Sequence, residues 1–252
     1  MKNLLATFFL SLSFISVFGQ EMENESKTSV SRFIDYVKHE KKDEIAKLVE
    51  FPFERQYPLP SIKNRNEFLI RYNEVFDDRL IKMIINSKPD KDWSAVGWRG
   101  IMFLDGDIWL DYDGRLLAVN YQSEIETKRR SDLIEQERSK LHESIKAFDR
   151  PLHILETKKY RIRIDDLGEN NFRYASWTLP APMSEQPDIV IENGEIEFDG
   201  TGGNHSFIFK NKEYVYECSI IVMGEDNAPP ALLTLHKGEK MILNQPAVII
   251  KK

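Results

Sequence analysis

A glycine-rich stretch is the segment of the chain that most resembles a binding motif. FDGTGGNHSFIFK, which begins at Phe198, carries Gly200, Gly202 and Gly203 directly after a short apolar run. A loop that binds phosphate passes it to the N-terminus of a helix, where unpaired backbone N–H groups converge. The residues after Gly203 alternate as a strand instead, and neither the Gly-Lys-Ser/Thr ending nor the G-x-G-x-x-G spacing occurs here. We therefore interpret the stretch as a turn between two strands.

The same region holds a candidate nucleophile. If Asn211-Lys212 forms a two-residue turn, the hairpin places His205 opposite Cys218. An imidazole beside a thiol can deprotonate it. No third member of such a site is found, so the pattern favours a small buried thiol beside a core histidine. Because Cys218 is the one cysteine of the chain, an internal disulfide is excluded.

Metal-binding patterns are weak. The five histidines are scattered, and none has H-x-x-x-H spacing. DYDG, residues 111–114, resembles the start of a calcium loop but lacks the later ligands and the terminal glutamate. We interpret it as a hairpin turn, and we expect no metal and no cofactor.

The first half of the chain predicts helices followed by strands. Two short helices are expected between Ser29 and Val49, and the proline-rich residues 51–62 are expected to be irregular. Asn64 can cap a third, long helix whose apolar stripe runs from Phe68 to Ile84. Beyond Pro89, three strands are separated by Asp-Gly pairs, which favour tight hairpin turns.

These hairpins define two sheet faces. Leu110 is expected opposite Leu117. The first face then collects Ile101, Phe103, Ile108, Leu110, Leu117, Val119 and Tyr121. The opposite face collects Trp98, Met102, Trp109, Leu116 and Ala118, and Trp98, Met102, Trp109 and Leu116 are the candidate interface residues. A patch this apolar is rarely left open, so we expect the C-terminal domain or a second copy, forming a homodimer, to cover it.

Helices followed by a curved meander, from SRFIDYVKHEKKDEIAKLVEFPF through NEFLIRYNEVF to GWRGIMFLDGDIWLDYDGRLLAVNY, resemble the nuclear transport factor 2-like fold shared by ketosteroid isomerase. The resemblance implies a pocket between helices and sheet. Arg99, expected on the helix-covered face, is a candidate for holding an anionic group of a ligand, with Tyr72, Tyr112 and Tyr121 as further ligand-binding candidates. The alternative is that Arg99 pairs with a glutamate or extends to water.

The second half predicts a helix and then strands. Ser123 and Glu126 form a capping box that opens a charged connecting helix. From His153 onward eight or nine short antiparallel strands are expected, with Asn193-Gly194 as one hairpin turn, which predicts a β-sandwich or barrel. The fold class is therefore α+β, with a signal peptide at 1–19, an α+β domain at 20–122, a connecting helix at 123–150 and a β-sandwich domain at 151–252.

The N-terminus and the charge suggest the location and the class of partner. Residues 1–19 carry one cation, a short apolar core and small residues before Gln20, which is typical of a cleaved signal peptide. We expect a secreted or periplasmic protein without an integral membrane segment after cleavage. The formal net charge of −6 argues against nucleic acid as a partner. We expect a non-catalytic protein that binds a small ligand or another protein; the alternative is an isomerase- or cyclase-like enzyme using the cone pocket.

Overall fold

The computed structural model describes residues 22–251, and the chain divides into two compact units, each described by itself. Unit 1 contains the described residues up to Glu50 together with Ile81–Val119. Unit 2 contains Phe51–Leu80 and the chain from Asn120 onward. The signal peptide and its cleavage before Gln20 fall outside the described residues. The domain boundaries expected at 122 and 150 stay a prediction.

Unit 1 combines helices with a small antiparallel sheet. Its helices are α1 (Asn24–Lys38), α2 (Lys42–Leu48), most of α4 (Asp78–Asn86) and α5 (Pro89–Asp92). The sheet has the order β1 (Trp93–Ala95), β2 (Ile101–Phe103), β3 (Ile108–Leu110) and β4 (Leu116–Val119). Phe33 of α1 packs edge-on against Trp93, which lies against Phe103, so helix and sheet share one core.

A bulge corrects the expected register of the last hairpin. Ile108 faces Val119 and Trp109 faces Ala118, but Leu110 faces Leu116 and not Leu117. The extra residue in β4 changes which side chains point inward. Leu116 is consequently fully buried rather than on the opposite face.

The long helix expected between residues 64 and 84 is two helices. α3 (Arg65–Val75) begins as predicted, since the Asn64 side chain accepts a hydrogen bond from the Glu67 N–H at 3.0 Å. It ends at Val75, and α4 begins at Asp78. The Asp77 carboxylate accepts the Leu80 N–H at 2.8 Å and so caps the N-terminus of α4. This cap stabilises the start of a second helix at the place where α3 would otherwise continue.

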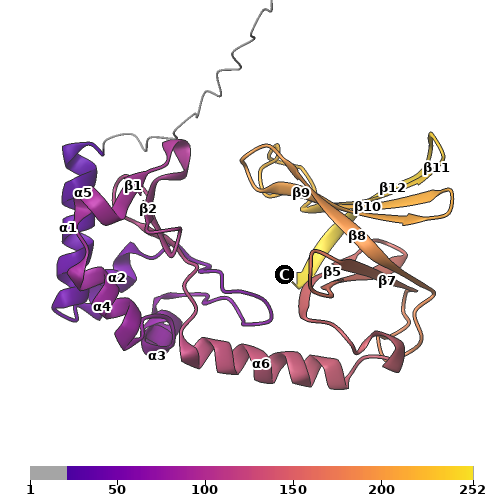
Figure 1. Cartoon of the computed structure of the whole chain (residues 1–252), viewed down its shortest axis with the longest axis horizontal. Coiled ribbons are helices and arrows are strands. Elements are labelled where there is room, and N and C mark those ends of the chain that lie inside the picture. The colour runs from indigo at the N-terminus through magenta and orange to yellow at the C-terminus, as the bar shows by residue number, and fades with distance from the viewer. Residues whose placement is uncertain (1–21, 252) are drawn as a thin grey trace, which may run out of the picture. The chain divides into compact units, whose positions relative to one another are not determined.

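Unit 2 is built around a closed eight-stranded antiparallel barrel, which is the second of the two architectures, sandwich or barrel, expected for the C-terminal strands (Figure 1). Its strands are β5 (Arg150–Glu156), β6 (Tyr160–Asp166), β7 (Phe172–Thr178), β8 (Ile189–Asp199), β9 (Asn204–Asn211), β10 (Tyr214–Ile220), β11 (Ala231–Lys237) and β12 (Lys240–Lys251). Pairing of β12 with β5 closes the ring.

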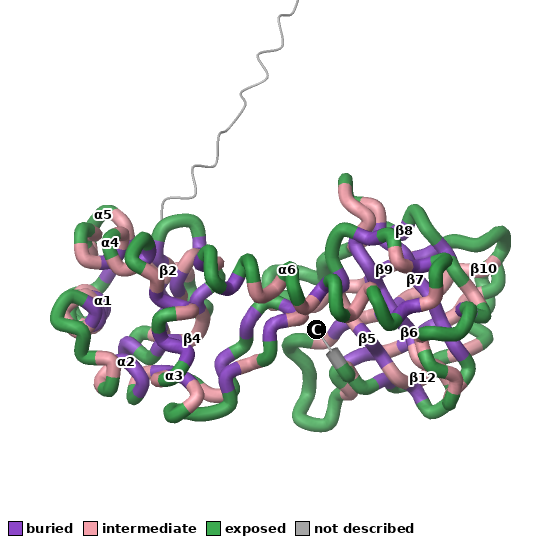
Figure 2. The backbone as a smooth tube through the Cα atoms, turned by 90° about the horizontal axis from the view of Figure 1, so that it is seen from below, coloured by how far each residue is buried: buried purple, intermediate pink, exposed green. Residues whose placement is uncertain are grey.

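Side chains pack the barrel interior, which an eight-stranded barrel is narrow enough to allow. Buried aliphatic and aromatic residues from all eight strands form its core, including Leu155, Ile164, Tyr174, Phe207 and Phe209. Figure 2 shows buried positions along the barrel strands and mostly exposed connecting loops. The fold class α+β is thus confirmed, with a barrel as the all-β part.

Two glycine segments have different roles. Gly200 and Gly203 have φ of 67° and 89° in the turn between β8 and β9, which confirms the turn interpretation. Asn193-Gly194 is not a hairpin turn, because it lies inside β8 where the register to β7 shifts. A Cβ at Gly194 would lie 2.2 Å from the Phe209 ring, so the position admits no side chain.

Candidate functional site

The ligand-binding candidates of unit 1 have local structural roles. Arg99 ends a 3-10 turn, Gly97–Arg99, and its guanidinium lies 5.6 Å from the centroid of the Trp109 ring. It is exposed and does not point to the helix-covered face, because the turn replaces the expected strand and the ring attracts the cation. The Tyr112 hydroxyl donates to the Gly97 carbonyl at 2.6 Å.

Tyr72 and Tyr121 belong to unit 2 and have different surroundings from each other. Tyr72 is buried and stacks on Phe76 with ring centroids 4.9 Å apart. The Tyr121 hydroxyl donates to the Asp77 carboxylate at 2.9 Å. Burial, and then the bond to Asp77, raise the pKa of Tyr121 to about 12. A ligand-binding role for these tyrosines stays a prediction.

Leu116 is not part of the exposed face expected for the candidate interface residues, while an interface role for the other three stays a prediction. Trp98 is 64% exposed, and Met102 faces Trp109 across β2 and β3 with both side chains partly exposed. Leu116 is excluded from an exposed surface by its burial.

His205 and Cys218 do not lie opposite each other, so the expected thiol–imidazole pair does not form. The hairpin turn is Lys212-Glu213, so Phe207 faces Cys218 and His205 faces Ile220. The prediction placed the turn one residue earlier, which shifted every pair by two positions. Cys218 is fully buried, and burial raises the pKa of its thiol. A protonated, inaccessible thiol is not a nucleophile.

The calcium-like stretch is a hairpin turn. The Asp111 carboxylate accepts the Arg115 N–H at 2.7 Å and the Arg115 Nε–H at 2.5 Å. Within residues 22–251 no group of three or more His, Cys, Asp or Glu side chains is arranged to hold a metal. In the same range, no helix has the length and apolarity needed to cross a membrane.

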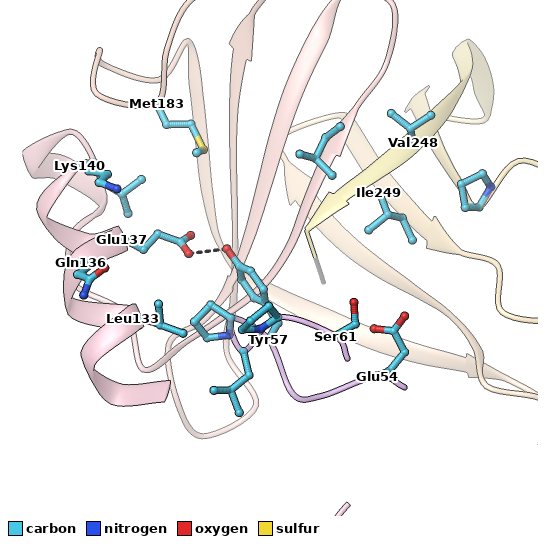
Figure 3. Close-up of a pocket in the computed structure, with 16 residues that line it drawn as sticks. Glu54, Tyr57, Ser61, Leu133, Gln136, Glu137, Lys140, Met183, Val248 and Ile249 are labelled. Carbon is cyan, nitrogen blue, oxygen red and sulfur yellow. Dashed lines mark hydrogen bonds between the residues drawn. The ribbon is translucent and has the colours of Figure 1, made fainter. Parts of the chain in front are cut away.

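The candidate site is an open cleft within unit 2, with a volume of about 730 Å³ (Figure 3). Its walls come from the proline-rich segment after Phe53, from α6 (Glu124–Ser139) and the residues after it, and from the barrel. Most of the lining is apolar: Pro58, Leu59, Pro60, Leu133, Leu141, Met183, Pro230, Val248, Ile249 and Ile250. This size and lining are typical of sites for small organic ligands.

Two polar groups of the cleft lining, Tyr57 and Glu137, bond to each other, and Glu137 also pairs with a buried arginine behind the lining. The buried Tyr57 hydroxyl donates to Glu137 Oε2 at 2.5 Å, and the Arg163 guanidinium pairs with Glu137 Oε1. Burial, and then Glu137, raise the pKa of Tyr57. Burial lowers the pKa of Arg163, but Asp165 and Glu137 more than offset that effect and raise it overall. Tyr57 is therefore neutral and Arg163 charged at physiological pH.

A second layer of charges lies behind Arg163. Asp165 Oδ2 accepts from Arg163 Nε at 3.0 Å and from Arg173 Nη2 at 2.6 Å. Arg173 also donates to the Ile145 and Ala147 carbonyls. Two carboxylates and two guanidiniums alternate, so the buried charges balance.

Capping and ion pairs fix the cleft walls to each other. Ser123 accepts the Glu126 N–H at 3.1 Å, which confirms Ser123 as the cap of α6, the first half of the predicted capping box. Glu126, fully buried, pairs with Arg55 at 2.8 Å, and the Arg130 Nε–H donates to the Tyr57 carbonyl at 2.8 Å. The helix is thus not a solvated connector, because one side of it holds the proline-rich segment.

No pattern in the sequence predicts this cleft. The capping box and the prolines were visible, but the lining residues are spread between positions 54 and 250. No family model, no curated protein and no solved structure matches the chain.

Proposed function

We propose that the chain is an exported, non-catalytic binding protein and that the apolar cleft of unit 2 is its ligand site. The signal-peptide pattern at residues 1–19 supports export. The observation that carries the proposal is the cleft itself, whose lining is mostly apolar and whose Tyr57 and Glu137 side chains are already paired.

The pairing favours binding over catalysis. A general acid or base needs a group that exchanges its proton near neutral pH. Tyr57 stays protonated because its pKa is raised, and Glu137 is held by both Tyr57 and Arg163. An apolar ligand entering the cleft gains free energy as its surface leaves water.

A neutral fluorescent probe, N-phenyl-1-naphthylamine, tests the site. We expect saturable one-to-one binding to the mature chain. Ile250 lines the cleft and is 48% exposed, so Ile250→Lys is expected to fold and to weaken binding about tenfold by placing a charge in the apolar wall.

The matched control is Ile242→Lys. Ile242 lies on the same strand, is 45% exposed and is not part of the cleft lining, so its variant is expected to bind like the wild type. Absence of saturable binding, or an equal loss in both variants, would contradict the proposal. Chemical conversion of a bound compound would favour the enzyme alternative.

A further inference from the structure

The two walls of the cleft differ in polarity. Every polar residue of the lining lies on the proline-rich segment or on α6 and its C-terminal end: Glu54, Tyr57, Ser61, Gln136, Glu137 and Lys140. The barrel contributes apolar residues alone: Met183, Pro230, Val248, Ile249 and Ile250. Figure 3 shows Gln136, Glu137 and Lys140 on one side of the cleft and Val248 and Ile249 on the other.

Two groups of the polar wall, Tyr57 and Glu137, favour hydrogen-bond donors in a ligand. The single hydroxyl proton of Tyr57 is directed to Glu137, so the phenolic oxygen can only accept a further bond. The Glu137 carboxylate is likewise an acceptor. A hydrocarbon chain covering both groups would strip water from them without replacing its hydrogen bonds, which costs free energy.

Lys140 adds a positive charge at the rim. It is the C-cap of α6 and exposed, and among residues 22–251 the structure shows no ion pair of its ammonium group. An acidic group of a ligand can pair with it.

We propose that the cleft binds a rigid facial amphiphile, a hydrocarbon skeleton with hydroxyl groups along one face and an acidic group at one end. The inference rests on the proposed function and specifies its ligand class. The apolar face lies on the barrel wall, the hydroxyl groups donate to Tyr57 and Glu137, and the acidic group pairs with Lys140. A linear fatty acid has no face that matches the polar wall.

Two steroid acids separate these contributions. Cholate carries hydroxyl groups on one face, and 5β-cholanate has the same skeleton and acid without them. Each is titrated, below its micellar concentration, against bound N-phenyl-1-naphthylamine. Tyr57→Phe removes the acceptor and leaves Glu137 paired with Arg163. We expect it to weaken cholate binding about fivefold and to leave cholanate binding unchanged.

The control is Tyr121→Phe, which also removes a tyrosine hydroxyl that donates to a carboxylate, but outside the cleft. It is expected to change neither affinity. An equal effect of Tyr57→Phe on both ligands, or no effect on either, would overturn the facial-amphiphile proposal while the probe still binds. Failure of the probe itself to bind would instead contradict the proposed function.

Lys140→Gln gives a second test that does not depend on a buried residue. We expect it to weaken cholate about fivefold and to leave methyl cholate, which lacks the charge, unchanged. Equal affinities of wild type and variant for cholate would contradict the assigned position of the acidic group and overturn the proposal as stated.

Discussion

At the scale of single residues, we expect a few buried charges near the cleft to contribute strongly to the stability of unit 2. Asp165 is fully buried and pairs with both Arg163 and Arg173, of which Arg163 has a second carboxylate partner in Glu137. The guanidiniums of Arg163 and Arg138 both contact the Phe148 ring, with their central carbons 4.8 and 4.5 Å from its centroid. Removal of the Asp165 charge leaves Arg173 buried without this carboxylate partner and Arg163 with Glu137 in its place, which costs far more than an exposed pair contributes.

We therefore expect Asp165→Asn to lower the free energy of unfolding by about 3 to 5 kcal/mol, measured by urea denaturation. Asp132→Asn is the control, since Asp132 pairs with Lys128 on the surface of α6, and its loss is expected to cost less than about 0.5 kcal/mol. Equal midpoints for the two variants would show that the buried charges contribute no more than surface ones.

At the scale of elements, local signals were predictable and register was not. The caps at Asn64 and Ser123 and the glycine turn after β8 were predicted correctly, because each depends on a few neighbouring residues. The bulges in β4 and β8 lie where the chain meets residues distant in sequence: Leu116 also bridges to Val49, and Gly194 lies under the Phe209 ring. The spacing of apolar residues therefore predicted the strands, but it placed Leu116 on the wrong sheet face. The Asn-Gly signal likewise predicted a turn at Asn193-Gly194, which lies inside a strand.

Gly194, at the bulge of β8, is a position where close packing excludes a larger side chain. We expect Gly194→Ala to destabilise the barrel by about 1 to 3 kcal/mol, because the new methyl group would overlap the Phe209 ring. Combination with Phe209→Leu tests the cause. The double variant is expected to lose less than the sum of the two single losses, measured by thermal unfolding. Additive losses would indicate that the backbone, and not the contact, requires glycine.

At the scale of the whole molecule, the cleft could not be predicted from the sequence, because it forms only when separate segments of unit 2 pack together. Its walls combine a segment near residue 57, α6 and the end of β12, and no spacing rule connects them. Packing within unit 2 also makes α6 part of the same unit as the barrel. Ile134, Leu141, Ile145 and Phe148 pack with Ala175 and Trp177 of β7.

This packing bears on the barrel as an independent domain. A fragment of residues 151–252 lacks α6 and the residues after it, so Trp177 becomes exposed and Arg163 and Arg173 lose partners at Glu137, Ile145 and Ala147. We expect it to be less stable than a fragment of residues 120–252 by about 5 kcal/mol, which is comparable with the whole stability of a small domain. Circular dichroism during heating should show cooperative unfolding of the longer fragment and a broad, early transition of the shorter one. Equal, cooperative transitions would mean that the barrel folds without α6, as a domain boundary at residue 150 predicts.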